Sequence, residues 1–217
     1  MSRPAEAMQT PPPTEILSFK TEDDARPVTS ALWRGGRHGL LLVDGMSGLP
    51  MRPWRSKLAQ LIGHGLTVLE PRPEPMGTEA GAALERSVET ISRMVAGGVA
   101  HLRGAGARAV SVLGIGRGAE AAAEAVLTGL VGNLDVLILV GPERVSGPVG
   151  RITQRVIFVV CDDDDAMKVA VEQHMFAPDT TQLTLYTGET PAAALFDSPQ
   201  HGLRLVKLII DALDADP

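Results

Sequence analysis

The sequence predicts an α/β fold: a three-layer α/β/α sandwich around a mostly parallel, doubly wound sheet. The first observation is that short apolar runs alternate with helical patterns along most of the 217 residues. The second is that these runs are continuous, without polar alternation, which is typical of strands covered on both faces. The third is that 44% of the residues are hydrophobic, enough for one substantial core. Right-handed crossovers would then place helices on both faces of the sheet.

Eight strands are expected. The first two, 16–19 and 29–33, alternate apolar and polar residues and flank a polar segment, so they are expected to form an antiparallel pair at the sheet edge. The other six strands are the continuous apolar runs, at 39–43, 66–69, 109–113, 136–140, 156–160 and 183–186.

Five helices are expected at 53–63, 78–103, 118–130, 165–175 and 199–213. The second has apolar residues at spacings of three and four from Leu84 to Leu102, which gives one apolar stripe. Gly97 and Gly98 are expected to kink this helix or to let another element approach it closely. Because the proline-containing loop 71–77 is too short to separate domains, we expect one domain over 14–217 after a disordered tail over 1–13.

Composition excludes several classes of function. The chain has 20 basic and 26 acidic residues and a net charge of −6, so it offers little affinity for nucleic acid. It has neither an apolar leader nor an apolar run long enough to span a bilayer, so neither secretion nor membrane insertion is expected. With Cys161 as the only cysteine, no intrachain disulfide can form. We therefore expect a cytoplasmic protein.

The most informative segment is a glycine-rich turn. Gly114, Gly116 and Gly118 close an apolar strand and open an alanine-rich helix. A sharp strand-to-helix turn with glycines on both sides of a central residue is the pattern of the nucleophile elbow. The central residue here is Gly116, which tolerates a positive φ angle but has no hydroxyl to attack a carbonyl. Arg117 comes next, and it is expected either to face a ligand cleft or to lie in solvent.

From about residue 14 to 213 the chain resembles small α/β-hydrolases of the dienelactone-hydrolase or serine-aminopeptidase-like kind. The resemblance implies an α/β-hydrolase fold. It also implies that Asp44, Gly45 and Met46 occupy the position of the oxyanion loop, where the family usually has His-Gly. The family's next strand usually ends in an Asp or Arg-Gly pattern, whereas this sequence has Glu70, Pro71 and Arg72 there.

The resemblance also implies positions for an acid and a base. The acid is expected after the strand that ends at Val160, where Asp164 and Asp165 are nearest the family's offset. The base is expected shortly after the last strand, where Pro191 stands instead, and His201 follows only at the start of the terminal helix. Without an activated hydroxyl and a base there is no route to an acyl-enzyme. The resemblance therefore indicates a member that lacks the nucleophile.

Other interpretations of these residues are weaker. Gly114, Gly116 and Ala119 also fit G-x-G-x-x-A, but that fingerprint usually follows the first strand of a nucleotide-binding unit. The acidic run 162–165 could attract a cation, but adjacent side chains rarely converge on one ion, so a solvated, helix-capping turn is favoured. Cys161 is expected to be a packing residue. No metal and no cofactor are expected.

The favoured function is that of a pseudo-hydrolase, a non-catalytic protein-interaction subunit or small-ligand-binding module. Its expected partner is another protein, a second copy or a small molecule. The alternative is an active hydrolase of carboxylic esters or peptides, with a displaced nucleophile such as Ser47 or Ser111 and with His201 as base. A serine and a histidine within hydrogen-bonding reach would contradict the favoured function, as would a turn 114–118 away from the carboxyl edge of the sheet. The remaining histidines lack ligand-like spacing and are expected to have no role: His38, His64, His101 and His174.

Overall fold

The computed structural model describes residues 11–21, 24–44, 53–72, 87–162, 165–188 and 192–214. Within these ranges the strands are β1 (Glu15–Thr21), β2 (Asp24–Trp33), β3 (His38–Val43), β4 (Leu66–Pro71), β5 (Ala109–Ile115), β6 (Val136–Val140), β7 (Arg155–Cys161) and β8 (Thr181–Tyr186). The α-helices are α1 (Leu58–Gly63), α2 (Val88–Gly104), α3 (Arg117–Leu127), α4 (Ala166–Phe176) and α5 (Gly202–Asp214). Short 3-10 helices span η1 (Pro53–Lys57), η2 (Val149–Arg151) and η3 (Ala192–Phe196).

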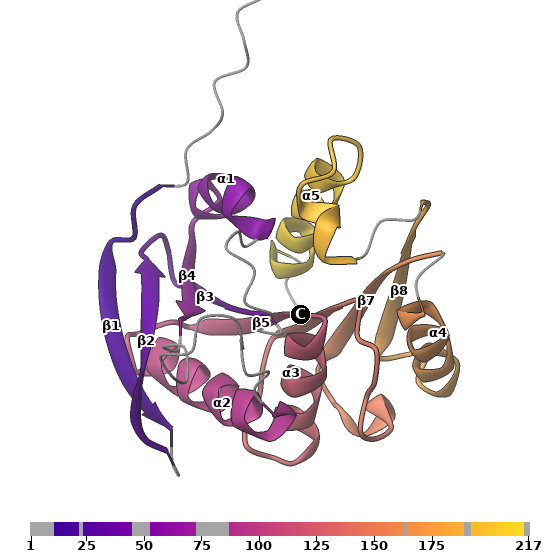
Figure 1. The fold of residues 1–217 in the computed structure, drawn as a ribbon, viewed down its shortest axis with the longest axis horizontal. Coiled ribbons are helices and arrows are strands. Elements are labelled where there is room, and N and C mark those ends of the chain that lie inside the picture. The colour runs from indigo at the N-terminus through magenta and orange to yellow at the C-terminus, as the bar shows by residue number, and fades with distance from the viewer. Residues whose placement is uncertain are drawn as a thin grey trace, which may run out of the picture.

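The strands form one sheet in the order β1-β2-β4-β3-β5-β6-β7-β8 (Figure 1). β1 pairs with β2, and β2 with β4, in antiparallel register. All later pairs, from β4–β3 to β7–β8, are parallel. The predicted fold class is therefore confirmed, including the antiparallel pair at one edge.

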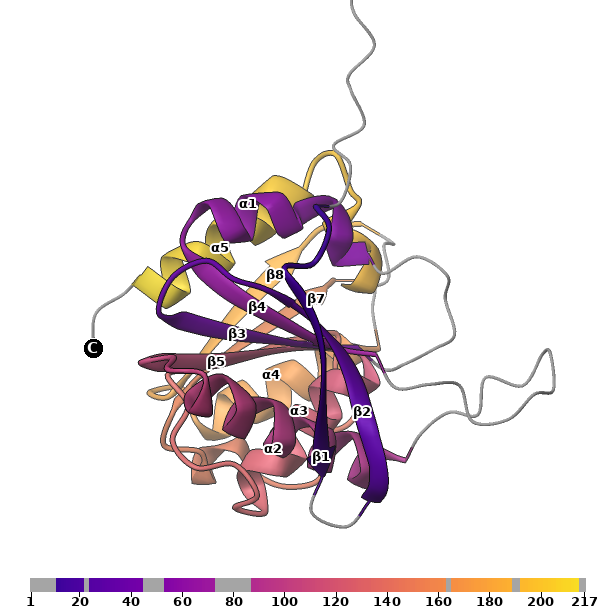
Figure 2. The ribbon, with the colours of Figure 1, turned by 90° about the vertical axis from the view of Figure 1, so that its left-hand side faces the viewer.

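The helices cover both faces of the sheet. α1 and α5 lie on one face, and α2, α3 and α4 lie on the other (Figure 2). Because side chains alternate along a strand, Leu41 and Val43 of β3 pack in the core under α2 and α3, whereas Leu40 and Leu42 pack in the core under α1 and α5. These two apolar cores explain why the strands read as continuous apolar runs.

Helix α2 begins later than the sequence pattern suggests. Ser87 has an extended backbone and its Oγ accepts a hydrogen bond from the Thr90 backbone N–H, so it is the N-cap. The prediction that residue 87 is helical was wrong, because Ser87 is the N-cap at which the helix begins. Residues 78–86 of the predicted helix lie outside the described residues. A Cβ on Gly97 would lie 2.9 Å from the Phe19 ring, and one on Gly98 would lie 2.7 Å from Leu41. Both glycines thus allow the sheet to approach the helix closely.

The start of the chain is described from Pro11 onward. The backbone carbonyl of Pro11 accepts a hydrogen bond of 2.9 Å from the Trp33 indole Nε1. Residues 1–10 of the expected tail lie outside the described part. No helix in the described residues is both long and apolar enough to cross a membrane.

Candidate functional site

The order of the strands across the sheet changes direction beside β3. β4, the strand after β3, is added on one side of β3, and β5 is added on the other side, so successive strands are added in opposite directions from this point. In open α/β sheets, ligands bind outside the carboxyl ends of the strands at such a switch point. Asp44 follows β3 and Gly116 follows β5, so both lie at the carboxyl edge of the sheet, where the turn 114–118 was expected.

Gly116 is held in an unusual backbone conformation, with φ 55° and ψ −123°. Its N–H donates to the Val140 carbonyl at 2.8 Å, and its own carbonyl accepts from the Ala119 N–H at 2.9 Å, so β6 and α3 both fix the turn. Among the described residues, no atom lies within 4 Å of a Cβ built on Gly116. A side chain at this position would therefore point into open space, but glycine supplies none.

The flanking glycines are required by close packing. A Cβ on Gly114 would lie 2.5 Å from Ala119 Cα, and one on Gly118 would lie 2.3 Å from the Val43 carbonyl oxygen. Real Cβ atoms do not approach backbone so closely. The glycine spacing in the sequence thus lets α3 start directly against the ends of β5 and β3. Arg117, the first residue of α3, is half-buried.

A half-buried carboxyl group lies one helical turn after Gly116. Desolvation raises the pKa of Glu120, and the nearby charge of Glu143 raises it further. A hydrogen bond of 3.1 Å from the Arg144 backbone N–H to Glu120 Oε1 opposes this rise, as does the charge of Arg117. No local pattern marks Glu120 in the sequence, because its burial depends on the loop after β6.

His201 is tied to the end of β8. Its exposure is only 5%, its ring lies edge-on to the Tyr186 ring at 5.1 Å, and Nε2 donates to the Thr187 carbonyl at 3.1 Å. Nδ1 is buried and has no partner among the described residues. β8 is three strands from β5, a lateral separation of about 14 Å at roughly 4.8 Å per strand. The contacts of His201 are thus with β8 rather than with Gly116.

The predicted acid and loop positions are described only in part. Gly45, Met46, Ser47, Asp164 and Pro191 lie outside the described residues.

Asp165 is exposed at the N-cap position of α4, but its side chain makes no capping hydrogen bond, and its Oδ1 lies 3.6 Å from Lys168 Nζ. The prediction of a capping side chain was therefore wrong for Asp165, because its backbone is already helical and turns the carboxylate toward a lysine in solvent. Asp162 is the acid that links strand ends, because its Oδ1 accepts from the Gly188 N–H at 2.9 Å.

A serine and a histidine do meet within hydrogen-bonding reach, which is the contact expected to contradict a non-catalytic function, but they meet near the amino ends of β3 and β5, away from Gly116. His38 Nε2 and Ser111 Oγ are 3.0 Å apart, and Ser111 is fully buried. Ser111 precedes Gly116 by five residues of β5, which is about 16 Å along a strand. Because no face of this hydroxyl is open, it cannot reach a substrate carbonyl. Desolvation lowers the pKa of His38, which keeps the ring neutral, while Asp135 and Asp214 act in the opposite direction.

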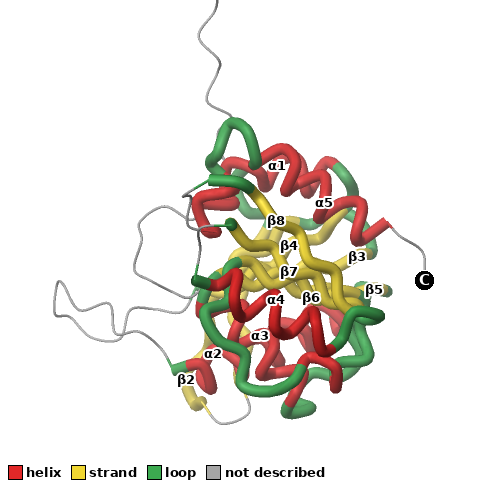
Figure 3. The backbone as a smooth tube through the Cα atoms, turned by 90° about the vertical axis from the view of Figure 1, so that its right-hand side faces the viewer, coloured by secondary structure: helices red, strands yellow, loops and turns green. Residues whose placement is uncertain are grey.

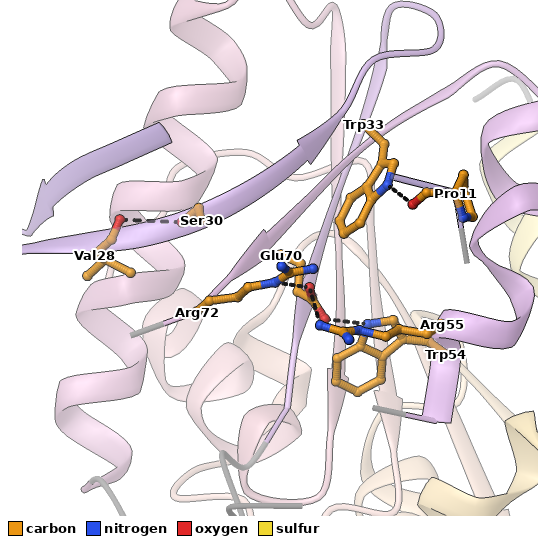
Figure 4. A network of polar contacts seen from close by, with 8 residues as sticks. All are labelled: Pro11, Val28, Ser30, Trp33, Trp54, Arg55, Glu70 and Arg72. Carbon is orange, nitrogen blue, oxygen red and sulfur yellow. Dashed lines mark hydrogen bonds and ion pairs between the residues drawn. The ribbon is translucent and has the colours of Figure 1, made fainter. Parts of the chain in front are cut away.

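A buried charge network lies at the carboxyl end of β4 (Figure 4). The Glu70 carboxylate is fully buried and accepts hydrogen bonds from Trp54 Nε1 at 3.0 Å and from Arg72 Nε at 2.6 Å. Arg55 lies 3.8 Å from the same carboxylate, and the Arg72 guanidinium lies 5.5 Å above the Trp33 ring. The Glu70 carboxylate is thus held inside the fold by an indole and two arginines. An acid inside an apolar strand was the signal that could have revealed it.

Two further predictions concern Cys161 and metals. Cys161 is 1% exposed and packs in the core under α1 and α5, so the prediction of a packing residue is confirmed. In the described part of the chain, no group of three or more His, Cys, Asp or Glu side chains is arranged to hold a metal ion.

Comparison with known proteins gives relatives by structure alone. No family model matches the chain, and no curated protein matches it. A dienelactone hydrolase from Anabaena variabilis matches with a TM-score of 0.72 and 14% identity, over 91% of this chain and 94% of that one. A soluble variant of monoglyceride lipase from Saccharomyces cerevisiae matches with a TM-score of 0.72 and 13% identity, over 99% and 98%.

An esterase from Pyrococcus furiosus matches with a TM-score of 0.69 and 12% identity, over 92% of this chain and 89% of the esterase. Such low identities establish architecture but not activity. Since these matches cover nearly the whole of both chains, this protein has the α/β-hydrolase fold.

Proposed function

We propose that this protein is a non-catalytic α/β-hydrolase-fold protein that acts as a protein-interaction subunit or small-ligand-binding module. The observation that carries the proposal is Gly116. It stands at the centre of the strand-turn-helix where serine hydrolases present their attacking hydroxyl, and it has no side chain. Without a nucleophile at that position the carboxyl edge of the sheet can bind a ligand but cannot form an acyl-enzyme.

The other groups that could support catalysis are engaged elsewhere. His201 donates its Nε2–H to Thr187, and Asp165 lies in solvent beside Lys168. Ser111 is buried at the amino side of the sheet. Triad catalysis requires a hydroxyl, a base and an orienting acid in contact with one another. These described residues do not make such a chain of contacts, which supports the proposal.

The competing function is a hydrolase with a displaced nucleophile and His201 as base. The contacts of His201 differ from those of a triad base, in which Nδ1 binds an acid and Nε2 binds the hydroxyl, because Nε2 of His201 donates to Thr187 and Nδ1 has no partner among the described residues. In the competing function, the nucleophile would come from another serine, such as Ser47. A serine-directed fluorophosphonate probe separates the two functions, because it labels only an activated hydroxyl.

The first experiment measures hydrolysis of p-nitrophenyl esters and fluorophosphonate labelling of the wild-type protein. We expect turnover no higher than that of the heat-denatured protein, and no label. Labelling of a serine, or turnover well above the denatured control, would overturn the proposal. The nucleotide-binding alternative is tested on the same sample by a titration with NAD, for which no saturable binding is expected.

A matched pair of variants then tests the turn itself. Gly116→Ser adds a hydroxyl where a Cβ meets open space, and Gly116→Ala adds the same backbone strain, about 1–3 kcal/mol, without the hydroxyl. We expect both variants to remain unlabelled by the fluorophosphonate, because Nε2 of His201 is bound to Thr187. Labelling of the serine variant alone would show that a base does reach the turn.

A further inference from the structure

Strand β8 is an edge strand, and the backbone groups at Leu183 and Leu185 have no hydrogen-bond partner among the described residues. The Val156 N–H donates to the Thr180 carbonyl and the Asp162 N–H to the Tyr186 carbonyl, both at 3.0 Å, so the even-numbered residues of β8 face β7. The backbone groups of Leu183 and Leu185 therefore point to the free edge. No strand of the described residues pairs there, and Figure 3 looks onto this side, where β8 lies between α4 and α5.

The two edges of the sheet are protected differently. Natural edge strands usually carry charges, prolines or bulges that block pairing with another chain. β1 carries Glu15 and Lys20, and its register with β2 shifts between Phe19 and Thr21. β8, with the sequence TQLTLY, has no charged residue and no proline. Only the β8 edge thus lacks the usual protection.

Exposed apolar side chains accompany this edge. Leu185 is 51% exposed, and Leu183 packs against the core on the side of α4. Met175 and Phe176, at the end of α4, are each 75% exposed. Since side chains alternate along a strand, Leu183 and Leu185 share the face that α4 covers.

We propose that β8 pairs in antiparallel register with β8 of a second copy of this chain, around a two-fold axis at Thr184. In this register Leu183 of each copy lies opposite Leu185 of the other. These are the residues whose backbone groups face the free edge, so each pair can exchange two backbone hydrogen bonds. The same contact pairs leucine with leucine twice, and the interface is isologous, as a closed dimer requires.

The neighbouring register explains why the axis lies at Thr184. Centring the axis on Leu183 would place Thr181 opposite Leu185. The Thr181 N–H already donates to the Ala177 carbonyl at 3.1 Å, and its hydroxyl donates to the same carbonyl. That register would lose hydrogen bonds and bury Leu185 against a hydroxyl. Of these two registers, only the one centred on Thr184 pairs leucine with leucine, which is the reason to infer a second copy rather than an unrelated strand.

Analytical ultracentrifugation of the purified wild-type chain tests the dimer. We expect a species of twice 22.9 kDa at micromolar concentration. Leu185→Lys should weaken dimerisation by at least about a hundredfold, because the two-fold axis brings two like charges into the contact. Ile16→Lys is the matched control, since Ile16 is 57% exposed on the opposite edge strand, and it should leave the dimer intact. A monomeric wild type, or equal loss in both variants, would overturn the proposal.

Disulfide trapping tests the register. At the axis, Thr184 faces its own copy in a non-hydrogen-bonded pair with Cα atoms about 4.5 Å apart, which a disulfide can bridge. Mild oxidation of Thr184→Cys should give a covalent dimer, whereas Leu183→Cys should not, and the native Cys161 is buried. Failure of Thr184→Cys to cross-link would refute this register. The dimer is independent of whether the cleft is catalytic, so the ester assay and this test can fail separately.

Discussion

Glu70 is a fully buried carboxylate, so its replacement tests how far this network stabilises the fold. Glu70→Gln keeps an oxygen for Trp54 but loses the charge-assisted bond of 2.6 Å to Arg72 and places an amide N–H2 near a donor. Breaking a buried ion pair by removing one partner costs about 3–5 kcal/mol. Because 28% of the Arg72 side chain is exposed and can regain water, we expect a loss of about 2–4 kcal/mol in the free energy of unfolding.

The assay is urea unfolding followed by tryptophan fluorescence, with circular dichroism as a second probe. Glu15→Gln is the matched control, since it breaks an ion pair of 2.9 Å to Arg34 in which the two side chains are 46% and 51% exposed. Such an exposed pair contributes at most about 1 kcal/mol. The reasoning is refuted if Glu70→Gln shifts the free energy of unfolding no more than Glu15→Gln does.

Three further predictions concern Gly118, His38 and Glu120. Gly118→Ala should lower the free energy of unfolding in urea by more than about 2 kcal/mol, because its Cβ would lie 2.3 Å from the Val43 carbonyl oxygen. Gly104→Ala is the control, since its Cβ meets no described atom, and it should stabilise the protein by about 0.5–1 kcal/mol. Similar stabilities of the two variants would contradict this packing. Burial lowers the pKa of His38 in the folded protein. As the pH falls, the unfolded chain therefore binds a proton at His38 before the folded chain does. The stability that is present above about pH 6.5 is then lost as the pH falls through the lowered pKa. His38→Asn should flatten that decline in thermal melts between about pH 7 and 5, and an unchanged slope would speak against the burial effect. Burial raises the pKa of Glu120, so its ionisation opposes folding as the pH rises through that pKa. Glu120→Gln should therefore have a higher melting temperature than wild type at neutral pH and an equal one below about pH 4.5. A lower melting temperature of the variant at neutral pH would contradict a raised pKa.

Much of the fold followed from local patterns. The continuous apolar runs predicted parallel strands because a strand covered on both faces needs apolar residues on both. The alternating runs at 16–19 and 29–33 predicted the antiparallel pair, which the structure extends at both ends. The predicted helix boundaries were less accurate, since α2 begins only after Ser87, whose side chain caps it by a hydrogen bond. A capping serine thus sets the start of a helix even where the apolar spacing of three and four continues before it.

Of the candidate site, only the turn 114–118 was predictable, because the spacing of its glycines is visible in the sequence. The spacing of Gly114, Gly116 and Gly118 indicated a tight strand-to-helix turn, because each flanking Cβ would collide with backbone. The surroundings of Glu70 and His201 were not predictable. Arg72 is two residues from Glu70 and so shares its side of the extended chain, but Trp54 for Glu70 and Thr187 for His201 have no spacing that marks them as partners in the sequence.

The sequence alone determined the order of strands and helices, the parallel sheet and the absence of a hydroxyl at residue 116, because these depend on residues that are neighbours in the chain. Only the tertiary structure decided which polar groups are buried, which edge of the sheet remains open and where Ser111 meets His38. Those properties arise when segments far apart in sequence exclude water from one another, and the local order of residues does not encode that exclusion.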